Sequence, residues 1–561
     1  MAAQETCDLV VIGSGAAGLS AAVTAAHQGL KVIVLEKAPV LGGTTAWSGG
    51  WMWVPRNPLA VSAGIVEDIS APRTYLEHVL GNNFDAARAD AFLRAAPEMV
   101  GFFQSSTALQ FECGTQIPDT YGNLPGAGQG GRSVIAAPFD ARALGTDIAN
   151  LRKPLPETTF MGMTIQAGPD LRAFMSMTRS PRAFVHVTRR FARHLSDLVL
   201  YRRGMDLRNG LALVARLMRS ARDATVDLRT SAVVTALMSD ADRVTGVEIE
   251  TAAGPATIKA RCGVILATGG VPHEAARLDP LSHGNRSPRS LATPFSTGAG
   301  ASLAESVGAA FDTTSASASA YCPVSEVPNK TGTTTLFPHI IERGKPGIIG
   351  VLQNGRRFCN EGNGYHDYVA AMLDATPQGE DPQSWLICTG AFQRRYGLGM
   401  SRPSPVPAGP YLRSGYIKSG KTIADLAKAC GIDPDGLGQT LQTYNKHAKS
   451  GEDPEFSRGE TPYNRLQGDP TQKPNPCVAP IETGPFFAVR VIPGSFGTFA
   501  GLKTNEHAQV LRADGAAIDG LYAAGADMAS VMGGFYPAGG INLGPAMTFG
   551  YIAGRHAAGQ S

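Results

Sequence analysis

Two kinds of residue in this sequence are suited to chemistry: glycine-rich turns that can hold a phosphorylated cofactor, and tyrosines that stand beside such turns. The first glycine cluster covers 13–18 and reads Gly-Ser-Gly-Ala-Ala-Gly. Tyr536 is followed by Pro-Ala-Gly-Gly, and Tyr365 follows an Asn-Gly pair. A phenol can donate a hydrogen bond to a carbonyl oxygen or, once ionised, accept a proton. The combination predicts proton transfer and oxyanion stabilisation beside a bound cofactor.

The N-terminal segment carries the pattern of a complete dinucleotide-binding unit. A β-rich run at 7–12 leads into the glycine cluster, a helix of small residues follows, and a second strand ends at Glu36. Gly13 permits the tight turn, Gly15 lets the backbone approach a pyrophosphate, and Gly18 allows close packing of helix on strand. The helix N-terminus then meets the phosphate charge, and Glu36 can accept hydrogen bonds from a ribose.

Three further glycine turns favour FAD over NAD. The cluster at 41–50 follows the acidic strand directly and is suited to wrapping the far half of a longer cofactor. A short apolar strand at 264–270 ends in a glycine turn, and the segment 520–527 brings Asp527 to the ribityl chain. The residues expected to bind FAD are Gly13, Gly15, Ala16, Ala17, Gly18, Glu36, Lys37, Gly42, Gly43, Thr44, Thr45, Ser48, Gly49, Gly50, Val233, Thr268, Gly269, Gly525, Asp527, Asn542 and Leu543.

These four elements resemble, in their order, those of the fumarate reductase/succinate dehydrogenase flavoprotein superfamily, and the resemblance spans nearly the whole chain. The sequence Tyr-Pro-Ala-Gly-Gly at 536–540 is similar to the Tyr-Pro-Gly-Pro-Gly of its 3-ketosteroid Δ1-dehydrogenases. The resemblance implies that the Tyr536 hydroxyl and the Gly540 amide grip a substrate carbonyl. Two donors aimed at one oxygen stabilise the enolate formed when the neighbouring carbon loses a proton. The helix that follows Asn542 would turn its positive end toward the flavin.

The stretch 354–367 is similar to an Arg-Phe-x-Asn-Glu motif of fumarate reductases, with Tyr365 where those enzymes carry a proton-delivering arginine. Ketosteroid dehydrogenases place a tyrosine base in this neighbourhood. The resemblance therefore implies that Tyr365 abstracts the proton α to the carbonyl and that Tyr121 is an auxiliary tyrosine. An ordinary tyrosine has a pKa near 10, so Tyr365 would need cationic neighbours or the enolate-stabilising pair to act near neutrality. An ordinary hydrogen-bonded tyrosine is the alternative at each position.

The C-terminal region argues against dicarboxylate substrates. Fumarate reductases clamp a dicarboxylate with paired histidines and an arginine, whereas this chain carries no charge between Asp527 and Arg555. A dianion without cationic partners would be disfavoured in a closed site. Phe496, Phe499 and Phe535 instead predict an apolar pocket for a ring-shaped substrate, although each alone is more often a core residue.

Length and motif order predict the domain organisation. A chain of 561 residues exceeds one compact core. We expect an α/β fold in which a Rossmann-like FAD-binding domain, residues 1–297 and 484–561, carries an inserted mobile α+β capping or substrate domain, residues 298–483. Helices are expected in this insert near 422–429 and 437–449.

Charge and composition exclude several function classes. With 50 Lys+Arg against 47 Asp+Glu, the net charge of +3 disfavours a nucleic-acid partner. The eight cysteines are too far apart for zinc or redox motifs, so no metal is expected. No signal peptide or integral membrane segment is apparent, which favours a cytoplasmic location. The basic amphipathic segment 189–203 is interpreted as a packed helix with a solvated polar face, with a membrane-surface helix as the alternative.

Two absences shape the functional prediction. No second strand–GxGxxG–helix unit is found, so an external electron acceptor is required; and no histidine lies between Lys37 and Gly50, so FAD should bind non-covalently. We expect an FAD-dependent dehydrogenase that introduces a C=C bond next to the ketone of a cyclic substrate, either a 3-ketosteroid or a cyclohexanone-type ring, with the β hydrogen leaving as hydride to flavin N5. The alternatives are a reductase of an activated alkene and a non-catalytic electron-transfer subunit.

Overall fold

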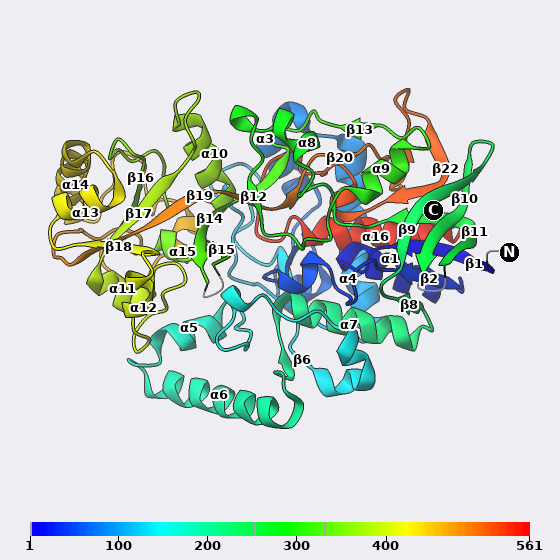
Figure 1. Cartoon of the computed structure of the whole chain (residues 1–561), viewed down its shortest axis with the longest axis horizontal. Helices are drawn as coiled ribbons and strands as arrows, with labels where there is room; N and C mark the ends of the chain where they lie inside the picture. The colour runs from blue at the N-terminus through cyan, green and yellow to red at the C-terminus, as the bar shows by residue number, and fades with distance from the viewer. Residues whose placement is uncertain (1–2, 252–253, 330–331, 561) are drawn as a thin grey trace.

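The computed structural model describes residues 3–251, 254–329 and 332–560, and it contains two large sheets (Figure 1). In the first sheet the strand order is β21-β22-β10-β11-β1-β2-β8, with β9 paired to β10. The central pairs are parallel: β1 lies between β11 and β2. The strands are β1 (Ala3–Ile12), β2 (Val32–Leu35), β8 (Asp227–Arg229), β9 (Val233–Asp240), β10 (Arg243–Thr251), β11 (Gly254–Leu266), β21 (Gln509–Leu511) and β22 (Ala517–Ala523).

The two ends of the chain meet beside this sheet. Helix α1 (Ala16–His27) follows β1 and packs along α16 (Leu543–Ala557). Both helices present small residues at the contact: a Cβ added at Gly554 would lie 2.7 Å from the Ala21 carbonyl oxygen. This close contact places the N-termini of two helices from opposite ends of the sequence at one edge of the sheet.

The second sheet has the strand order β15-β14-β19-β17-β16, with β12 and β18 paired to β19. Its long strand β19 (Phe486–Thr498) lies after residue 484, yet it pairs with strands from the middle of the chain. The division into two domains at the expected residues stays a prediction. The other strands are β12 (Arg289–Ser290), β14 (Ser319–Pro328), β15 (Thr334–Pro338), β16 (Ile348–Val351), β17 (Ser384–Thr389) and β18 (Ile417–Gly420).

Both helices expected in the middle of the chain are present. Helix α13 (Ile423–Cys430) begins after Thr422, whose hydroxyl and Asp425 form a capping box. Helix α14 (Pro434–Ala448) follows at once. The remaining larger helices are α3 (Ser70–Leu80), α4 (Ala86–Ser106), α7 (Asn209–Asp223), α9 (Ala299–Glu305), α10 (Tyr365–Ala375), α11 (Gly390–Tyr396) and α15 (Pro462–Gln467).

A helical segment is inserted between β6 (Phe139–Asp140) and β7 (Asp206–Leu207), and these two strands pair with each other. It carries α5 (Pro169–Ser176) and α6 (Pro181–Tyr201), seen along the lower edge of Figure 1. The exposed face of α6 carries apolar residues such as Val185 and Val199 together with Arg182, Arg189 and Arg193, whereas the buried face includes charged side chains. The exposed arginines agree with a packed helix that has a solvated polar face, but the apolar residues on the same face were not expected.

Candidate active site

One cavity of about 1620 Å³ is lined by residues from both sheets and from α5. It brings together most of the residues expected to bind the cofactor. Gly18, Gly42 and Asp527 are not among its lining residues. The expected residues that do line it are Gly13, Gly15, Ala16, Ala17, Glu36, Lys37, Gly43, Thr44, Thr45, Ser48, Gly49, Gly50, Val233, Thr268, Gly269, Gly525, Asn542 and Leu543.

The first glycine turn leaves room for a phosphate in front of its backbone. Gly13 has a φ of +108° and a Cβ there would overlap the Ala267 carbonyl, so this position admits only glycine. A Cβ at Gly18 would overlap the Gly13 carbonyl oxygen. At Gly15, by contrast, the nearest atom is Thr45 Oγ1 at 3.4 Å. The space at Gly15, ahead of the positive end of α1, fits an anionic pyrophosphate.

Glu36 is held rigidly at the end of β2. One carboxylate oxygen accepts hydrogen bonds from the Ser14 hydroxyl at 2.6 Å and the Ser14 amide at 3.2 Å, and the other accepts from the Ala38 amide at 2.8 Å. Glu36 nevertheless lines the cavity. Free lone pairs of this fixed carboxylate can therefore accept hydrogen bonds from a ribose.

Asp527 is placed differently from its sequence expectation. Its carboxylate accepts hydrogen bonds from the Thr268 hydroxyl at 2.9 Å, from the Gly270 amide at 2.9 Å and from the Thr268 amide. The side chain is buried, and this burial raises the pKa of Asp527. In this structure Asp527 fixes the third glycine turn, and the cavity wall is made by Thr268 and Gly269.

The two tyrosines meet in the cavity. The ring centroids of Tyr365 and Tyr536 lie 4.8 Å apart at an interplanar angle of 69°, and both residues line the cavity. Phe496 packs edge-on against Tyr365 at 5.4 Å, and Phe499 lies 6.2 Å from Tyr536. Phe535 does not line the cavity. Phenols from the start of α10 and from the loop before α16 thus face one apolar space.

Gly540 presents a backbone donor next to Tyr536. Its φ is +103°, and an added Cβ would lie 2.7 Å from the Trp53 amide nitrogen, so this backbone position excludes any side chain. The Gly540 carbonyl accepts hydrogen bonds from the Trp53 and Gly544 amides, whereas no described residue accepts one from the Gly540 amide. Asn542 Nδ2 donates to the Tyr536 hydroxyl at 3.3 Å. A free amide and an oriented phenol therefore stand side by side.

Tyr121 supports the helix that carries Tyr365 and does not line the cavity. Its hydroxyl donates a 2.7 Å hydrogen bond to Asp367 Oδ1 in the first turn of α10. Burial raises the pKa of Asp367 to about 6, although the hydrogen bond from Tyr121 lowers it. The structure thus connects Tyr121 with Tyr365 through the backbone of α10.

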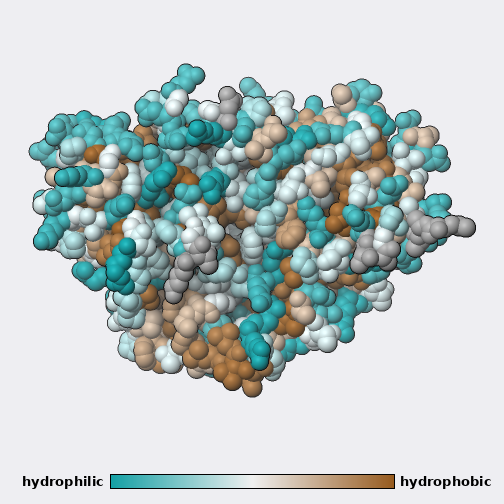
Figure 2. Space-filling model, viewed as in Figure 1, coloured by the Kyte–Doolittle hydropathy of each residue, from teal (hydrophilic) through white to brown (hydrophobic). Residues whose placement is uncertain are grey.

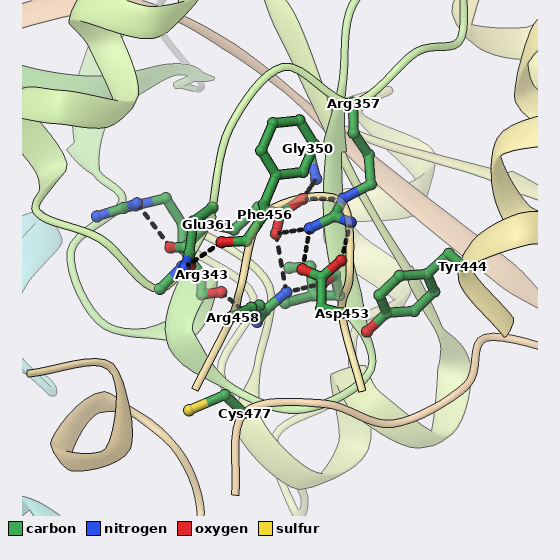
Figure 3. Close-up of polar contacts among 12 residues, drawn as sticks. Arg343, Gly350, Arg357, Glu361, Tyr444, Asp453, Phe456, Arg458 and Cys477 are labelled. Carbon is green, nitrogen blue, oxygen red and sulfur yellow. Dashed lines mark hydrogen bonds and ion pairs between the residues drawn. The ribbon is translucent and has the colours of Figure 1, made fainter. Parts of the chain in front are cut away.

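The basic residues nearest Tyr365 in the sequence, Arg356, Arg357 and His366, have other partners in the described structure. Arg357 binds Glu361 and Asp453 (Figure 3), and Arg356 donates to Gln439. The His366 Nδ1 atom accepts a hydrogen bond from the Tyr321 amide, and burial lowers the pKa of His366 to about 4. His366 is therefore neutral at pH 7.

Burial controls the acidity of both cavity phenols. Desolvation raises the pKa of Tyr365 well above the ordinary value, and the adjacent Tyr536 raises it further. Burial likewise raises the pKa of Tyr536, while its interaction with Tyr365 lowers it. Both phenols are protonated at neutral pH, which suits Tyr536 as a hydrogen-bond donor.

Tyr463 and Arg402 are among the cavity residues that the sequence analysis did not identify. Tyr463, at the start of α15, lines the cavity and influences the pKa of both Tyr365 and Tyr536. No glycine motif precedes it, so no sequence signal singled it out. Arg402 also lines the cavity, where it donates hydrogen bonds to the Glu157 and Thr159 carbonyls. The cavity wall is therefore not entirely uncharged.

Comparison with known proteins relates the whole chain to flavoproteins. Over 98% of its length the chain is 37% identical to the 4-oxocyclohex-2-ene-1-carboxylate 5-dehydrogenase of Sinomonas cyclohexanicum, covering 94% of that protein. It is 35% identical to the 3-oxosteroid 1-dehydrogenase of Mycobacterium tuberculosis, with 99% and 98% of the two chains covered.

A solved structure is similar over nearly the whole chain. The crystal structure of 3-ketosteroid delta1-dehydrogenase from Sterolibacterium denitrificans, in complex with 1,4-androstadiene-3,17-dione, superimposes with a TM-score of 0.91 at 33% identity, covering 99% of this chain and all of that one. Within the described residues, no helix is both long and apolar enough to cross a membrane. The family model described as FAD binding domain matches residues 8–543, and the chain therefore belongs to this family of FAD-binding flavoproteins.

Proposed function

We propose that this chain is an FAD-dependent dehydrogenase that introduces a carbon–carbon double bond next to the ketone of a cyclic substrate. The observation that carries the proposal is the convergence of Tyr365, Tyr536 and the unpaired Gly540 amide on one cavity beside the glycine turns. The relatives named as dehydrogenases of oxocyclohexene carboxylates and of 3-oxosteroids support it.

Tyr536 and Gly540 hold the substrate carbonyl. The phenol and the amide both donate to the carbonyl oxygen, and their hydrogen bonds strengthen as negative charge develops on that oxygen. Asn542 keeps the Tyr536 hydroxyl in place from the other side. Because the site is buried, these donors act in a low dielectric and need little reorganisation.

Tyr365 removes the proton from the carbon next to the carbonyl. Since its pKa is raised, proton loss from Tyr365 to solvent precedes the reaction only in a small fraction of molecules at neutral pH. The polarised carbonyl compensates by acidifying the α carbon. We assign Tyr121 and Asp367 to positioning Tyr365 through the first turn of α10.

The cofactor is held non-covalently by the cavity wall. Gly15 and the N-terminus of α1 would receive the pyrophosphate, Glu36 the adenosine ribose, and the N-terminus of α16 the electron-rich edge of the ring system. FAD supplies a hydride acceptor for the β hydrogen. We assign reoxidation to an external electron acceptor, since the sequence contains no second strand–GxGxxG–helix unit.

Flavin absorbance without oxygen tests this proposal. The holoenzyme is mixed anaerobically with 4-androstene-3,17-dione, 4-oxocyclohexanecarboxylate or cyclohexanone, and succinate serves as the control. We expect bleaching with at least one cyclic ketone and none with succinate. Bleaching by the carboxylated ring alone would assign an anion-binding role to the cavity arginines. Absence of bleaching with every ketone would contradict the dehydrogenase.

Reduction of an activated alkene is a second candidate, and the protonated state of Tyr365 favours it. A neutral phenol at this position can deliver a proton to the α carbon of an enone. Dithionite-reduced enzyme reoxidised by an enone, together with no bleaching by the saturated ketone, would identify the reductase. Bleaching by the saturated ketone supports the dehydrogenase.

A further inference from the structure

One arm of the cavity extends from the phenols along the second sheet. Its first wall comes from β15 and the loop that follows, with Phe337, Ile340 and Ile341. The facing wall belongs to the segment inserted between β6 and β7 and includes Leu155 and, on α5, Met175. This segment lies along the lower edge of Figure 1, where Figure 2 shows hydrophobic residues gathered on the outer surface. These side chains give the arm apolar walls.

A guanidinium without a carboxylate partner lines this arm. Arg402 Nη2 donates to the carbonyl oxygens of Glu157 at 2.8 Å and Thr159 at 3.0 Å. Among the residues that the structure describes, Arg402 Nη1 and Nε have no hydrogen-bond acceptor, and no carboxylate lies within ion-pair distance. Burial lowers the pKa of Arg402, but a guanidinium remains charged at neutral pH. Two of its nitrogens are therefore left to donate to a ligand.

Lys345 is a second basic residue of the cavity wall. Its Nζ donates to the carbonyl oxygens of Gln467 at 2.6 Å and Gly468 at 2.8 Å. An ammonium has three donors, so one N–H of Lys345 has no acceptor within the described part of the chain. Burial lowers the pKa of Lys345, and the nearby Asp469 raises it. Like the guanidinium, this ammonium is held by neutral carbonyl oxygens.

The carboxylates nearest to these two basic groups have other partners. Glu342 lines the cavity and accepts a 2.6 Å hydrogen bond from His339 Nδ1. Asp469 also lines it and accepts hydrogen bonds from Arg395 Nη2 and from the Tyr396 hydroxyl, each at 2.6 Å. A desolvated cation without a counter-charge costs free energy, and an anionic ligand would remove that cost.

A short stretch of chain connects Arg402 with the phenols. The Arg402 guanidinium lies over the ring of Phe337, 5.9 Å from its centroid. Three residues later, Ile340 packs against the same apolar cluster as Tyr365. Three residues of chain span at most about 11 Å. A ligand that starts at Tyr365 and follows the arm would therefore bring its far end toward Arg402.

We propose that Arg402, assisted by Lys345, binds a carboxylate at the end of the substrate opposite to the reacting ketone. This inference rests on the proposed function, because it requires the ketone to lie at Tyr536 and Gly540. The substrate class is then a cyclic ketone that carries a carboxylate. Hydrogen bonds between a guanidinium and a carboxylate are stronger than those between neutral groups, and the apolar walls of the arm strengthen them further.

Binding of matched acids and methyl esters to the oxidised holoenzyme tests this subsite. The short pair is 4-hydroxybenzoate and its methyl ester, and the long pair is 3-oxochola-1,4-dien-24-oic acid and its methyl ester. The reacting ring of every probe is already unsaturated, so isothermal titration calorimetry measures Kd without turnover. We expect the acid of at least one pair to bind about tenfold or more tightly than its ester. The pair that shows this preference gives the distance between ketone and carboxylate.

Substitutions assign the preference to its residues. Arg402→Gln should abolish the preference for the acid and leave the Kd of the ester unchanged, whereas Arg402→Lys should keep part of it. Lys345→Gln should reduce the preference by a smaller factor. Arg394→Gln changes an exposed arginine outside the cavity lining and is the matched control, for which both Kd values should stay the same. Flavin absorbance and Tm verify folding, and an unchanged ester Kd excludes a distorted cavity.

Two results would overturn the subsite: equal Kd values for acid and ester in both pairs, or a preference for the acid that survives in Arg402→Gln. Failure of the subsite is distinguishable from failure of the proposed function. Flavin bleaching by neutral cyclic ketones without any preference for an acid would contradict the subsite alone. A preference for the acid together with no bleaching by any ketone would contradict the dehydrogenase and support the anion-binding role of Arg402.

Discussion

Two buried polar centres lie on the same stretch of chain, one around Arg357 and one around Tyr365, and they differ in charge. Around Arg357, buried arginines and carboxylates form ion pairs (Figure 3), whereas the two residues that meet in the cavity around Tyr365, eight residues later, are uncharged phenols. A buried charge is costly unless it is paired. Burying a neutral phenol costs less desolvation free energy than burying a charge, and its hydroxyl can still form a hydrogen bond with a ligand.

The charged centre holds the segment from which Tyr365 emerges. Glu361 accepts hydrogen bonds from Arg357 Nε at 2.9 Å and Nη2 at 2.8 Å, and also from Arg458 and the Gly350 amide. Asp453 accepts two more from Arg357, each at 2.7 Å. We infer that this cluster fixes the loop before α10; on the proposed function, the phenols perform the chemistry.

Tyr365→Phe is expected to have the largest effect, on the rate of anaerobic flavin reduction. On the proposed function, removing the hydroxyl assigned to accept the α proton should slow anaerobic flavin reduction by about 10²–10⁴-fold. In the parent protein the rate should rise with pH through neutrality, because burial holds the pKa of Tyr365 above its usual range. Stopped-flow absorbance measures both, and the pH-dependent rise should vanish in the variant.

Tyr463→Phe is the matched control for this substitution, since Tyr463 also lines the cavity but is given no proton to transfer. A Tyr365→Phe enzyme that keeps its rate while Tyr463→Phe loses it would transfer the base to α15. The contrast between the ion-paired cluster and a cavity of phenols would then remain, but the base would be Tyr463 and not Tyr365.

Glu361→Gln should have the second largest effect, on stability. The change leaves Arg357 and Arg458 buried with one carboxylate fewer, and breaking a buried ion pair in this way costs about 3–5 kcal/mol. Denaturant unfolding of the holoenzyme measures the loss. Asp381→Asn, which disrupts the exposed pair with Arg286, is the control and should cost about 1 kcal/mol or less. A Glu361→Gln protein as stable as the parent would show that the ion pairs around Arg357 do not stabilise the fold.

The sequence predicted the glycine turns well because their chemistry is local. Gly13, Gly15 and Gly18 are separated by fixed short spacings, and the backbone geometry they permit depends on the absence of a side chain. The carboxylate of Asp527 was harder to place. It lies in the turn after β22, and its direction depends on Thr268, which is 259 positions away in sequence.

Long-range packing also explains the other differences. Arg357 and His366 are close to Tyr365 in the sequence and could have lowered its pKa. Arg357 instead forms an ion pair with Asp453, and burial lowers the pKa of His366 so that it is neutral. The orientation of α6 could not be predicted from its amphipathic pattern alone. Periodicity shows that a helix has two faces, and only tertiary contacts decide which face is buried.

Tyr536→Phe should reduce the rate less than Tyr365→Phe. Loss of one oxyanion donor costs about 3 kcal/mol of barrier, or roughly a hundredfold in rate, and the Gly540 amide still donates. Single-turnover flavin reduction provides the measurement. Tyr522→Phe, a buried tyrosine bonded to His556 and not part of the cavity lining, controls for loss of a buried hydroxyl. Equal losses in the two variants would contradict a specific role of Tyr536.

The smallest expected effect is the pH dependence of stability at Asp367. Its pKa is raised from 3.8 to about 6 in the folded protein, so its stabilising contribution is complete below pH 3.8 and is lost as the pH rises through about 6. Above that range the ionised carboxylate costs at most about 3 kcal/mol. Asp367→Asn keeps the acceptor for Tyr121 and removes the titration.

The Asp367→Asn variant should therefore gain stability relative to the parent between pH 4 and pH 7, by up to about 3 kcal/mol. Urea unfolding across this pH range gives the difference, with Asp374→Asn as the control on an exposed position of the same helix. If the two variants show the same pH dependence, the carboxylate under Tyr121 is not desolvated. The cavity region would then contain an ordinary charge, and its contrast with the cluster around Arg357 would rest on the phenols alone.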